Sequence, residues 1–127
     1  MAFWIFLFVC NLSIPGLLLL LGWVFRNHAP QSINGVYGYR TRRSMQNGET
    51  WRFAQAEFGR LSWRWGLAEL PLVPLGMLLV LGRGETVTGA VGGILCVVLC
   101  IPIGVMIGQV ERALRRTFDE EGRRITF

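Results

Sequence analysis

Long apolar stretches alternate along this chain with segments that carry most of its charge. Three stretches with few or no charged side chains cover residues 2–25, 65–82 and 87–110. Each is about as long as a helix must be to cross ~30 Å of hydrocarbon at a rise of about 1.5 Å per residue. A soluble domain of 127 residues could not bury three such segments on all sides. The pattern therefore predicts an all-α membrane protein with three transmembrane helices in a single domain, residues 1–127.

The distribution of arginine predicts the orientation of these helices. All 13 basic residues are arginines, with seven of them in residues 26–64 and five in residues 111–127. The turn between the second and third apolar stretches holds Arg83 beside Glu85. Because basic segments stay on the cytoplasmic side, we expect the N-terminus outside and the C-terminus inside. Residues 26–64 are then a cytoplasmic loop, and residues 111–127 a cytoplasmic tail.

The first apolar stretch has a second interpretation, as a cleaved signal peptide. It has no basic segment before it, its apolar run is long, and no small-residue cleavage site follows. We therefore expect a retained span. Pro15 and Gly16 lie near its middle and predict a kink, because proline removes one backbone hydrogen bond.

Two glycine pairs mark the third stretch, each spaced by four residues. They are Gly89 with Gly93 and Gly104 with Gly108. Such pairs let helices approach closely. We expect them to pack the three-helix bundle tightly, and a dedicated dimer face is the alternative.

Glu69 lies about one turn inside the second predicted span. An ionised carboxylate at membrane depth costs roughly several kcal/mol unless it is paired. We therefore expect Glu69 to face protein or water, with Arg64 or another loop arginine as its partner. The alternative interpretation is a proton- or ligand-responsive site.

Helical spacing of apolar residues indicates a further helix before the second span. Asn47 or Thr50 could cap it, and Glu49 suits its positive end. The stripe comprises Trp51, Ala54, Phe58, Leu61 and Trp65. It predicts an interfacial amphipathic helix that leads into the second span, with Gly66 as a bend. After the third span a similar stripe continues to Phe118, Gly122 is a natural stop, and residues 123–127 are expected to be loose.

The loop before this helix is basic and aromatic. Arg40, Arg42 and Arg43 fall within four residues, and Tyr37 and Tyr39 lie just upstream. Beside a membrane, each basic residue gains about 1 kcal/mol from anionic lipid, and aromatic side chains prefer the same depth. A bilayer with anionic headgroups is therefore an expected partner, and direct binding of nucleic acid is not expected.

Composition also argues against catalysis and against a metal or other cofactor. Hydrophobic residues make up 52% of the chain and charged residues 17%, so a bundle of this size leaves little room for a catalytic cleft. His28 is the only histidine, and neither a carboxylate pair nor a Ser–His arrangement is visible. The cysteines, Cys10, Cys96 and Cys100, all lie in predicted spans and are expected to be small packing residues rather than metal ligands.

The loop and the tail carry a family resemblance. The residues that carry it are Asn34, Gly38, Tyr39, Arg40, Thr41, Ser44, Met45, Asn47 and Trp51, followed by Glu111, Leu114, residues 117–120 and Gly122. Their order and position after a span resemble the SdpI family of small bacterial membrane proteins. The resemblance implies a multi-pass helical protein of the bacterial cell membrane with no known catalytic activity. The family's namesake is an immunity protein against a secreted toxin, which also holds a transcriptional repressor at the membrane.

Two hypotheses of function follow from the resemblance and the residues. The first is immunity to, or sensing of, a membrane-active peptide or toxin through the arginine-rich loop; the second is a small accessory subunit of a larger membrane complex. A protein or peptide partner is expected in both, and a homo-oligomer would also fit. The candidate binding residues are Asn34, Gly38, Tyr39, Arg40, Thr41, Asn47, Trp51 and Glu69. The alternative is that these residues only fold the loop, with Arg40 tied to backbone carbonyls or to Glu69, Asn47 as a helix cap and Trp51 as an interface anchor.

Overall fold

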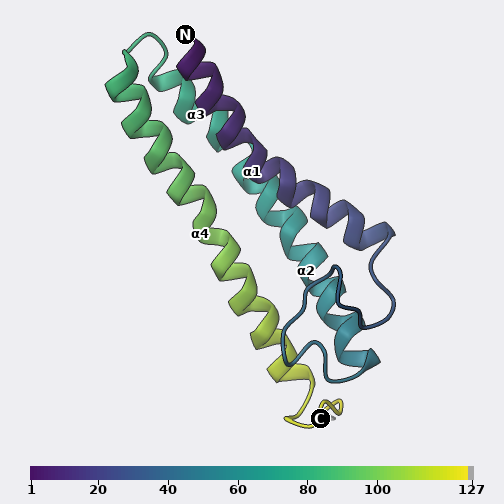
Figure 1. Ribbon diagram of the computed structural model, residues 1–127. Helices are drawn as coiled ribbons and strands as arrows, with labels where there is room; N and C mark the ends of the chain where they lie inside the picture. The colour runs from purple at the N-terminus through teal and green to yellow at the C-terminus, as the bar shows by residue number, and fades with distance from the viewer. Residues whose placement is uncertain (126–127) are drawn as a thin grey trace.

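The computed structural model describes residues 1–125, and its regular elements in that range are four α-helices. They are α1 (Ala2–Asn27), α2 (Gly48–Glu69), α3 (Leu72–Leu79) and α4 (Glu85–Thr117). The N-terminus and the α3–α4 turn lie at one end of the molecule, and the loop 28–47 and the C-terminal tail lie at the other (Figure 1). We call this second end the basic end, and define it as residues 28–60 and 111–125. Twelve of the thirteen arginines lie in the predicted cytoplasmic segments, residues 26–64 and 111–127. The thirteenth, Arg83, lies in the α3–α4 turn at the opposite end.

Two helices, α1 and α4, are long and apolar enough to cross a membrane. In their most hydrophobic 18-residue windows only 22% and 17% of the residues are buried. The core helix of a soluble protein would be mostly buried instead, so lipid is the medium that suits these surfaces. The all-helical prediction is confirmed, while the orientation stays a prediction.

The second predicted span, residues 65–82, is divided between two helices. Helix α2 runs on through Gly66 to Glu69, and Leu70 and Pro71 separate it from the short helix α3. Pro71 and Pro74 both lack a backbone N–H, so a continuous hydrogen-bond ladder is interrupted here. Gly66, where a bend was expected, lies inside the continuous helix α2, and the break comes at Leu70 and Pro71. A third membrane crossing at this position stays a prediction.

Helix α1 contains Pro15 yet stays helical from Ala2 to Asn27, and its ribbon bends along its course (Figure 1). Polar side chains tie it to its neighbours inside the apolar region. The indole Nε1 of Trp4 donates to the carbonyl of Met77 at 2.8 Å, and Asn11 Nδ2 donates to the carbonyl of Gly92 at 3.2 Å. Such bonds satisfy groups that would otherwise be unpaired in hydrocarbon.

The amphipathic stripe of α2 packs on protein rather than on a membrane surface. Trp51 and Ala54 are fully buried and Leu61 is 7% exposed. The core around this stripe comprises Leu18, Tyr39, Ala54, Leu61, Met106, Val110, Leu114 and Phe118. The predicted periodicity of the helix is thus confirmed, but an interfacial position for its apolar face is wrong. A second, smaller cluster around Val73, Met77 and Leu99 lies between α3, α4 and the first half of α1.

Glycines bring α1 and α2 together, whereas three of the four paired glycines in α4 have no close neighbour in the described chain. A Cβ on Gly22 would lie 2.8 Å from the backbone nitrogen of Trp63, and one on Gly59 would lie 2.8 Å from Cβ of Phe25. By contrast, a Cβ on Gly93, Gly104 or Gly108 would meet nothing within 4 Å in the described part of the chain. The expectation that these α4 glycines pack the bundle is therefore wrong, except at Gly89, which contacts Phe3.

The cysteines and the tail also differ from expectation. Cys10, Cys96 and Cys100 are free and exposed, so they do not pack the interior of the described chain. Residues 118–125 turn back on α4 after Gly122, where φ is +82°. The amide of Ile125 donates to the carbonyl of Thr117 at 2.8 Å, so a loose tail is wrong as far as residue 125. Residues 126–127 lie outside the described residues.

Candidate binding surface at the basic end

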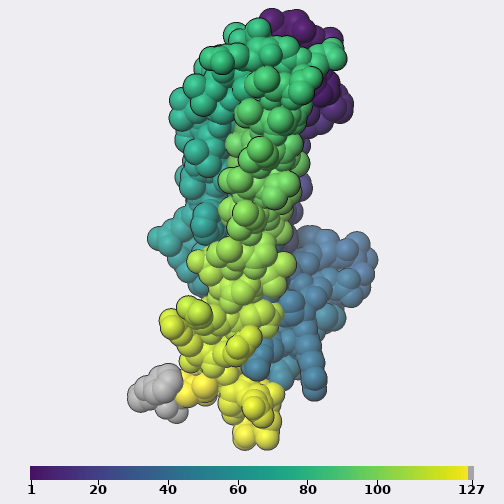
Figure 2. Space-filling model, turned by 90° about the vertical axis from the view of Figure 1, so that its left-hand side faces the viewer, coloured from purple at the N-terminus to yellow at the C-terminus, as the bar shows by residue number. Residues whose placement is uncertain are grey.

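The loop 28–47 is folded onto α2 by buried contacts, although it contains no helix of its own. Figure 2 shows this segment projecting beside the lower half of α4. Its first anchor is Trp51, whose side chain is fully buried and whose Nε1 donates to the carbonyl of Pro30 at 2.8 Å. The loop therefore starts from a position fixed in the interior.

Gly38 is the point at which the loop passes closest to α2. Its φ of +116° lies in the left-handed region that favours glycine. A Cβ there would lie 2.9 Å from Cγ of Pro30 and 3.0 Å from Oε1 of Gln55. Both the dihedral angle and the space therefore require glycine at this position.

Tyr39 is the central residue of the loop and is 7% exposed. Its backbone N–H donates to Gln55 Oε1 at 2.7 Å, and its carbonyl accepts from Gln55 Nε2 at 2.8 Å. The phenol donates to Oε1 of Glu111 on α4 at 2.8 Å. Burial, together with this carboxylate, raises the pKa of Tyr39 well above its usual range. Tyr39 thus joins the loop, α2 and α4 through three hydrogen bonds.

Ser44 closes the next turn of the loop. Its buried Oγ donates to the carbonyl of Tyr39 at 3.1 Å and accepts from the amide of Thr41 at 2.8 Å. The carbonyl of Ser44 in turn accepts from Oγ1 of Thr50 at 3.1 Å. Thr41 and Ser44 therefore shape the segment that holds the three clustered arginines.

Asn47 caps α2, as predicted, and also holds the tail. Its Oδ1 accepts from the amide of Thr50 at 2.9 Å, while its own amide donates to Oγ1 of Thr50 at 3.0 Å, which completes a capping box. The Nδ2 of Asn47 donates to the carbonyl of Gly122 at 2.7 Å. Gln46 adds a bond to the carbonyl of Glu120 at 2.6 Å, and Arg124 pairs with Glu49 at 2.7 Å. The loop, the start of α2 and the tail form one unit.

Five of the eight predicted site residues hold this unit together through hydrogen bonds or close packing. They are Gly38, Tyr39, Thr41, Asn47 and Trp51. Arg40 is exposed and pairs with neither a carboxylate nor Glu69 within residues 1–125. Asn34 lies in a separate exposed turn, where its Oδ1 accepts from the amides of Val36 and Tyr37 at 2.9 Å. The interpretation of the loop residues as folding residues is supported for most of the set, but not for Arg40.

Glu69 lies apart from the loop, close to the break between α2 and α3. It is 2% exposed, and neither carboxylate oxygen has a hydrogen-bond partner within residues 1–125. The expected salt bridge to Arg64 or to a loop arginine is therefore wrong in the described chain.

The sequence analysis missed Gln55 and the role of Glu111. Gln55 is 1% exposed and follows Ala54 directly, so it lies on the buried face of α2. A polar residue beside an apolar stripe was the available signal, because a buried amide needs partners. Glu111 was noted as part of the tail, but its bond to Tyr39 joins positions 72 residues apart.

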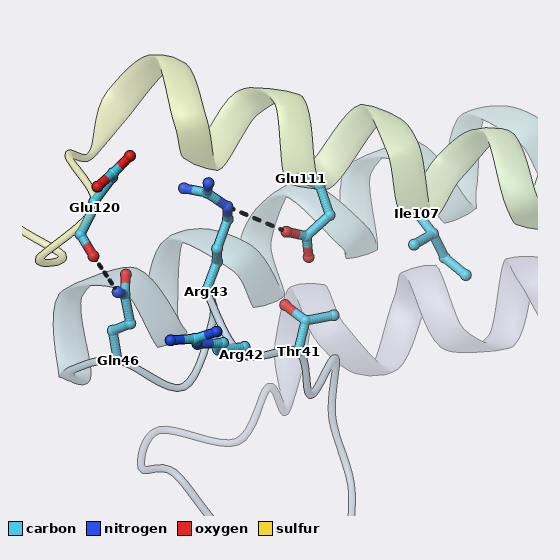
Figure 3. A pocket seen from close by; sticks show the side chains of 7 residues that line it. All are labelled: Thr41, Arg42, Arg43, Gln46, Ile107, Glu111 and Glu120. Carbon is cyan, nitrogen blue, oxygen red and sulfur yellow. Dashed lines mark hydrogen bonds and ion pairs between the residues drawn. The ribbon is translucent and has the colours of Figure 1, made fainter.

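A cleft of 580 Å³ opens between the loop and the end of α4 (Figure 3). It is lined by Thr41, Arg42, Arg43, Gln46, Ile107, Glu111 and Glu120. Arg43 reaches across it, with Nε 4.0 Å from Oε2 of Glu111, and Ile107 supplies an apolar wall. Both charge signs are therefore present, which suits a polar partner with its own charges. Within residues 1–125, histidine, cysteine and carboxylate side chains do not gather in any group that could hold a metal ion.

These features define a class: a small helical protein with two membrane-capable helices and a folded, arginine-bearing end. The model of the SdpI/YfhL protein family matches residues 31–108. The chain belongs to this family, as the motif around Arg40 predicts. The uncharacterized protein YfhL of Bacillus subtilis (strain 168) is 42% identical over 64 residues, which cover 50% of this chain and 56% of that protein. The chain thus matches about half the length of this curated relative, and no solved structure matches it.

Proposed function

We propose that this chain is a non-enzymatic protein of the bacterial cell membrane that recognises a membrane-active peptide or a protein regulator through its loop. Recognition would provide immunity to the peptide or signal its presence. The observation that supports this function best is a basic surface on a fixed backbone: Arg40 and Arg42 are exposed, and neither pairs with a carboxylate within residues 1–125.

The fixed backbone matters because binding is weakened by the entropy lost when a mobile loop is ordered. Tyr39, next to Arg40, is held by four hydrogen bonds to its backbone and side chain, from Gln55, Ser44 and Glu111. Arginine presents a planar fork that matches carboxylate or phosphate groups. Acidic groups of a partner, or anionic lipid headgroups, are the expected contacts. The proposal places the basic end in the cytoplasm and needs no cofactor.

The test is the sensitivity of cells. We expect deletion of the gene to sensitise cells to one member of a panel of membrane-active peptides, and expression of the wild-type chain to restore resistance. Arg40→Ala should fail to restore it. Arg83→Ala is the matched control, because Arg83 is also exposed but lies at the opposite end. Unchanged killing curves across the panel, at equal membrane levels of each variant, would contradict the proposal.

An accessory subunit of a larger membrane complex is the second candidate function. It is favoured by Gly93, Gly104 and Gly108 of α4, whose open faces would let the helix of another protein approach closely. Purification from native membranes in mild detergent, followed by mass spectrometry, tests it. A large partner in stoichiometric amount supports this function, whereas recovery of the chain alone or as a homo-oligomer opposes it.

A further inference from the structure

An apolar groove runs beside the break between α2 and α3, away from the loop. Its volume is 300 Å³, at the low end of the range for small-molecule sites. Its lining includes Trp65, Leu72, Val98, Ile101, Pro102 and Val105, which come from both sides of the break and from α4. Leu72, Val98 and Ile101 are exposed, so the groove is open to the lipid in which these helices would lie.

Glu69 is the charged residue among those that line this groove. Both of its carboxylate oxygens are buried and have no hydrogen-bond partner within residues 1–125. An ionisable group in an apolar setting is costly without a partner, and such groups mark ligand or ion sites in membrane proteins. Among the described residues that line the groove there is no arginine, although the sequence has thirteen.

A proline of α4 lies beside Glu69 in the same groove. Pro102 lies inside α4 and has no N–H, so it cannot donate the usual intrahelical hydrogen bond to the carbonyl of Val98. Val98 and Pro102 line the same groove as Glu69. The unpartnered carboxylate of Glu69 is complemented by a ligand that brings hydrogen-bond donors and positive charge.

We infer that this groove binds a small cationic amphiphile, with its ammonium group against Glu69 and its aliphatic chain along α4. An ammonium head group would stabilise the ionised form of the Glu69 carboxylate, and the apolar walls select the chain. A ligand with a carboxylate or sulfate head would place two negative groups together, so it is disfavoured. The site does not depend on the loop or on the function proposed for Arg40.

Photolabelling tests this inference. The probe is a dodecyl chain that carries a diazirine and an ammonium head, added to the full chain in nanodiscs of zwitterionic lipid. Probes with a hydroxyl or a sulfate head control for the chain. Mass spectrometry of the labelled peptides should place the ammonium probe on residues 65–72 and 98–105. It should label them about tenfold more than either control does, the change expected when a charge-assisted hydrogen bond is lost.

Two variants separate the head-group contact from the groove itself. Glu69→Gln should lower ammonium labelling to the level of the hydroxyl probe, and Ala68→Leu should fill the groove and block all three probes. Ala90→Leu, at an exposed alanine of α4 outside the groove, should label like the wild type. Equal labelling by the three probes, or full labelling of Glu69→Gln, would overturn the inference. If Glu69→Gln fails to fold, the head-group series and Ala68→Leu still decide it.

Discussion

The side-chain amide of Gln55 pairs with both backbone groups of Tyr39, accepting from its N–H at 2.7 Å and donating to its carbonyl at 2.8 Å. The Gln55 side chain thus forms the two backbone hydrogen bonds that a neighbouring strand would make in a β-sheet. Because both residues are buried, water cannot compensate for a missing bond. The loop is consequently part of the folded core and not a flexible arm.

The first prediction concerns this pair. Gln55→Ala removes the partner of the Tyr39 N–H and leaves that group buried, while the Tyr39 carbonyl keeps its bond from Ser44. We expect a loss of about 2 kcal/mol in the free energy of unfolding, the usual cost of one buried unpaired donor. Thermal unfolding of the purified chain in detergent measures it. Gln31→Ala, at an exposed glutamine of the same loop, should change the stability by less than about 0.5 kcal/mol.

The second prediction concerns Gly38. Gly38→Ala adds a Cβ at a φ of +116°, 2.9 Å from Pro30, so both backbone strain and overlap oppose it. We expect a loss of roughly 2–3 kcal/mol and a faster cleavage of the loop by protease. Gly35→Ala is the control, since its Cβ would meet nothing within 4 Å. Equal protease sensitivity of the two variants would count against a tightly packed loop.

The third prediction concerns pH. Burial and Glu111 raise the pKa of Tyr39 in the folded chain, whereas an unfolded tyrosine titrates near pH 10. A raised pKa means that the folded state holds the proton more tightly, so this contribution to stability is complete below about pH 10. It is lost as the pH rises above that value toward the folded pKa. We expect the wild type to lose up to about 1.4 kcal/mol per pH unit there.

Tyr39→Phe removes that titration and should flatten the curve of stability against pH above about pH 10. Its lost bond to Glu111 should also cost about 1 kcal/mol at neutral pH. Tyr37→Phe, at an exposed tyrosine two residues away, should keep the wild-type slope. Chemical unfolding from pH 8 to 11.5 measures all three chains, and identical slopes would show that Tyr39 is not the group responsible.

The sequence predicted those parts of the fold that depend on local signals. The apolar runs of α1 and α4 gave helices at the right places, and Asn47 with Thr50 gave the start of α2. The motif around Arg40 identified the family. These features need only the spacing of neighbouring residues, and propensity and capping act over a few positions.

Contacts between distant residues were not predictable in the same way. The bond from Tyr39 to Glu111 joins positions 72 apart, and the bond from Asn47 to Gly122 joins positions 75 apart. Periodicity assigned the stripe of α2 to a membrane surface, because an apolar face has the same pattern whether lipid or protein covers it. Glycine spacing in α4 was equally ambiguous, since Gly92, outside both pairs, packs on Leu7 of α1, whereas Gly93, Gly104 and Gly108 meet nothing within 4 Å in the described chain.

The fourth prediction separates these two sets of glycines. Gly22→Ala places a Cβ 2.8 Å from the backbone of Trp63, where no side chain can rotate away, so α1 and α2 must separate. We expect a loss of roughly 1–3 kcal/mol. Gly104→Ala meets nothing within 4 Å and should leave the stability of the isolated chain equal or slightly higher, because alanine favours helix. Comparable losses in both variants would contradict the close approach of α1 and α2 at Gly22.

The fifth prediction tests the orientation on which the proposed function depends. Native Cys10, Cys96 and Cys100 are first replaced by serine, and single cysteines are then introduced as Arg42→Cys and Arg83→Cys, both at exposed positions. Because the twelve arginines of residues 26–64 and 111–127 favour retention of these segments inside, a membrane-impermeant maleimide should label Arg83→Cys in intact cells. Arg42→Cys should react only after the cells are opened. Labelling of Arg42→Cys in intact cells would place the loop outside and contradict the cytoplasmic position that the proposed function requires.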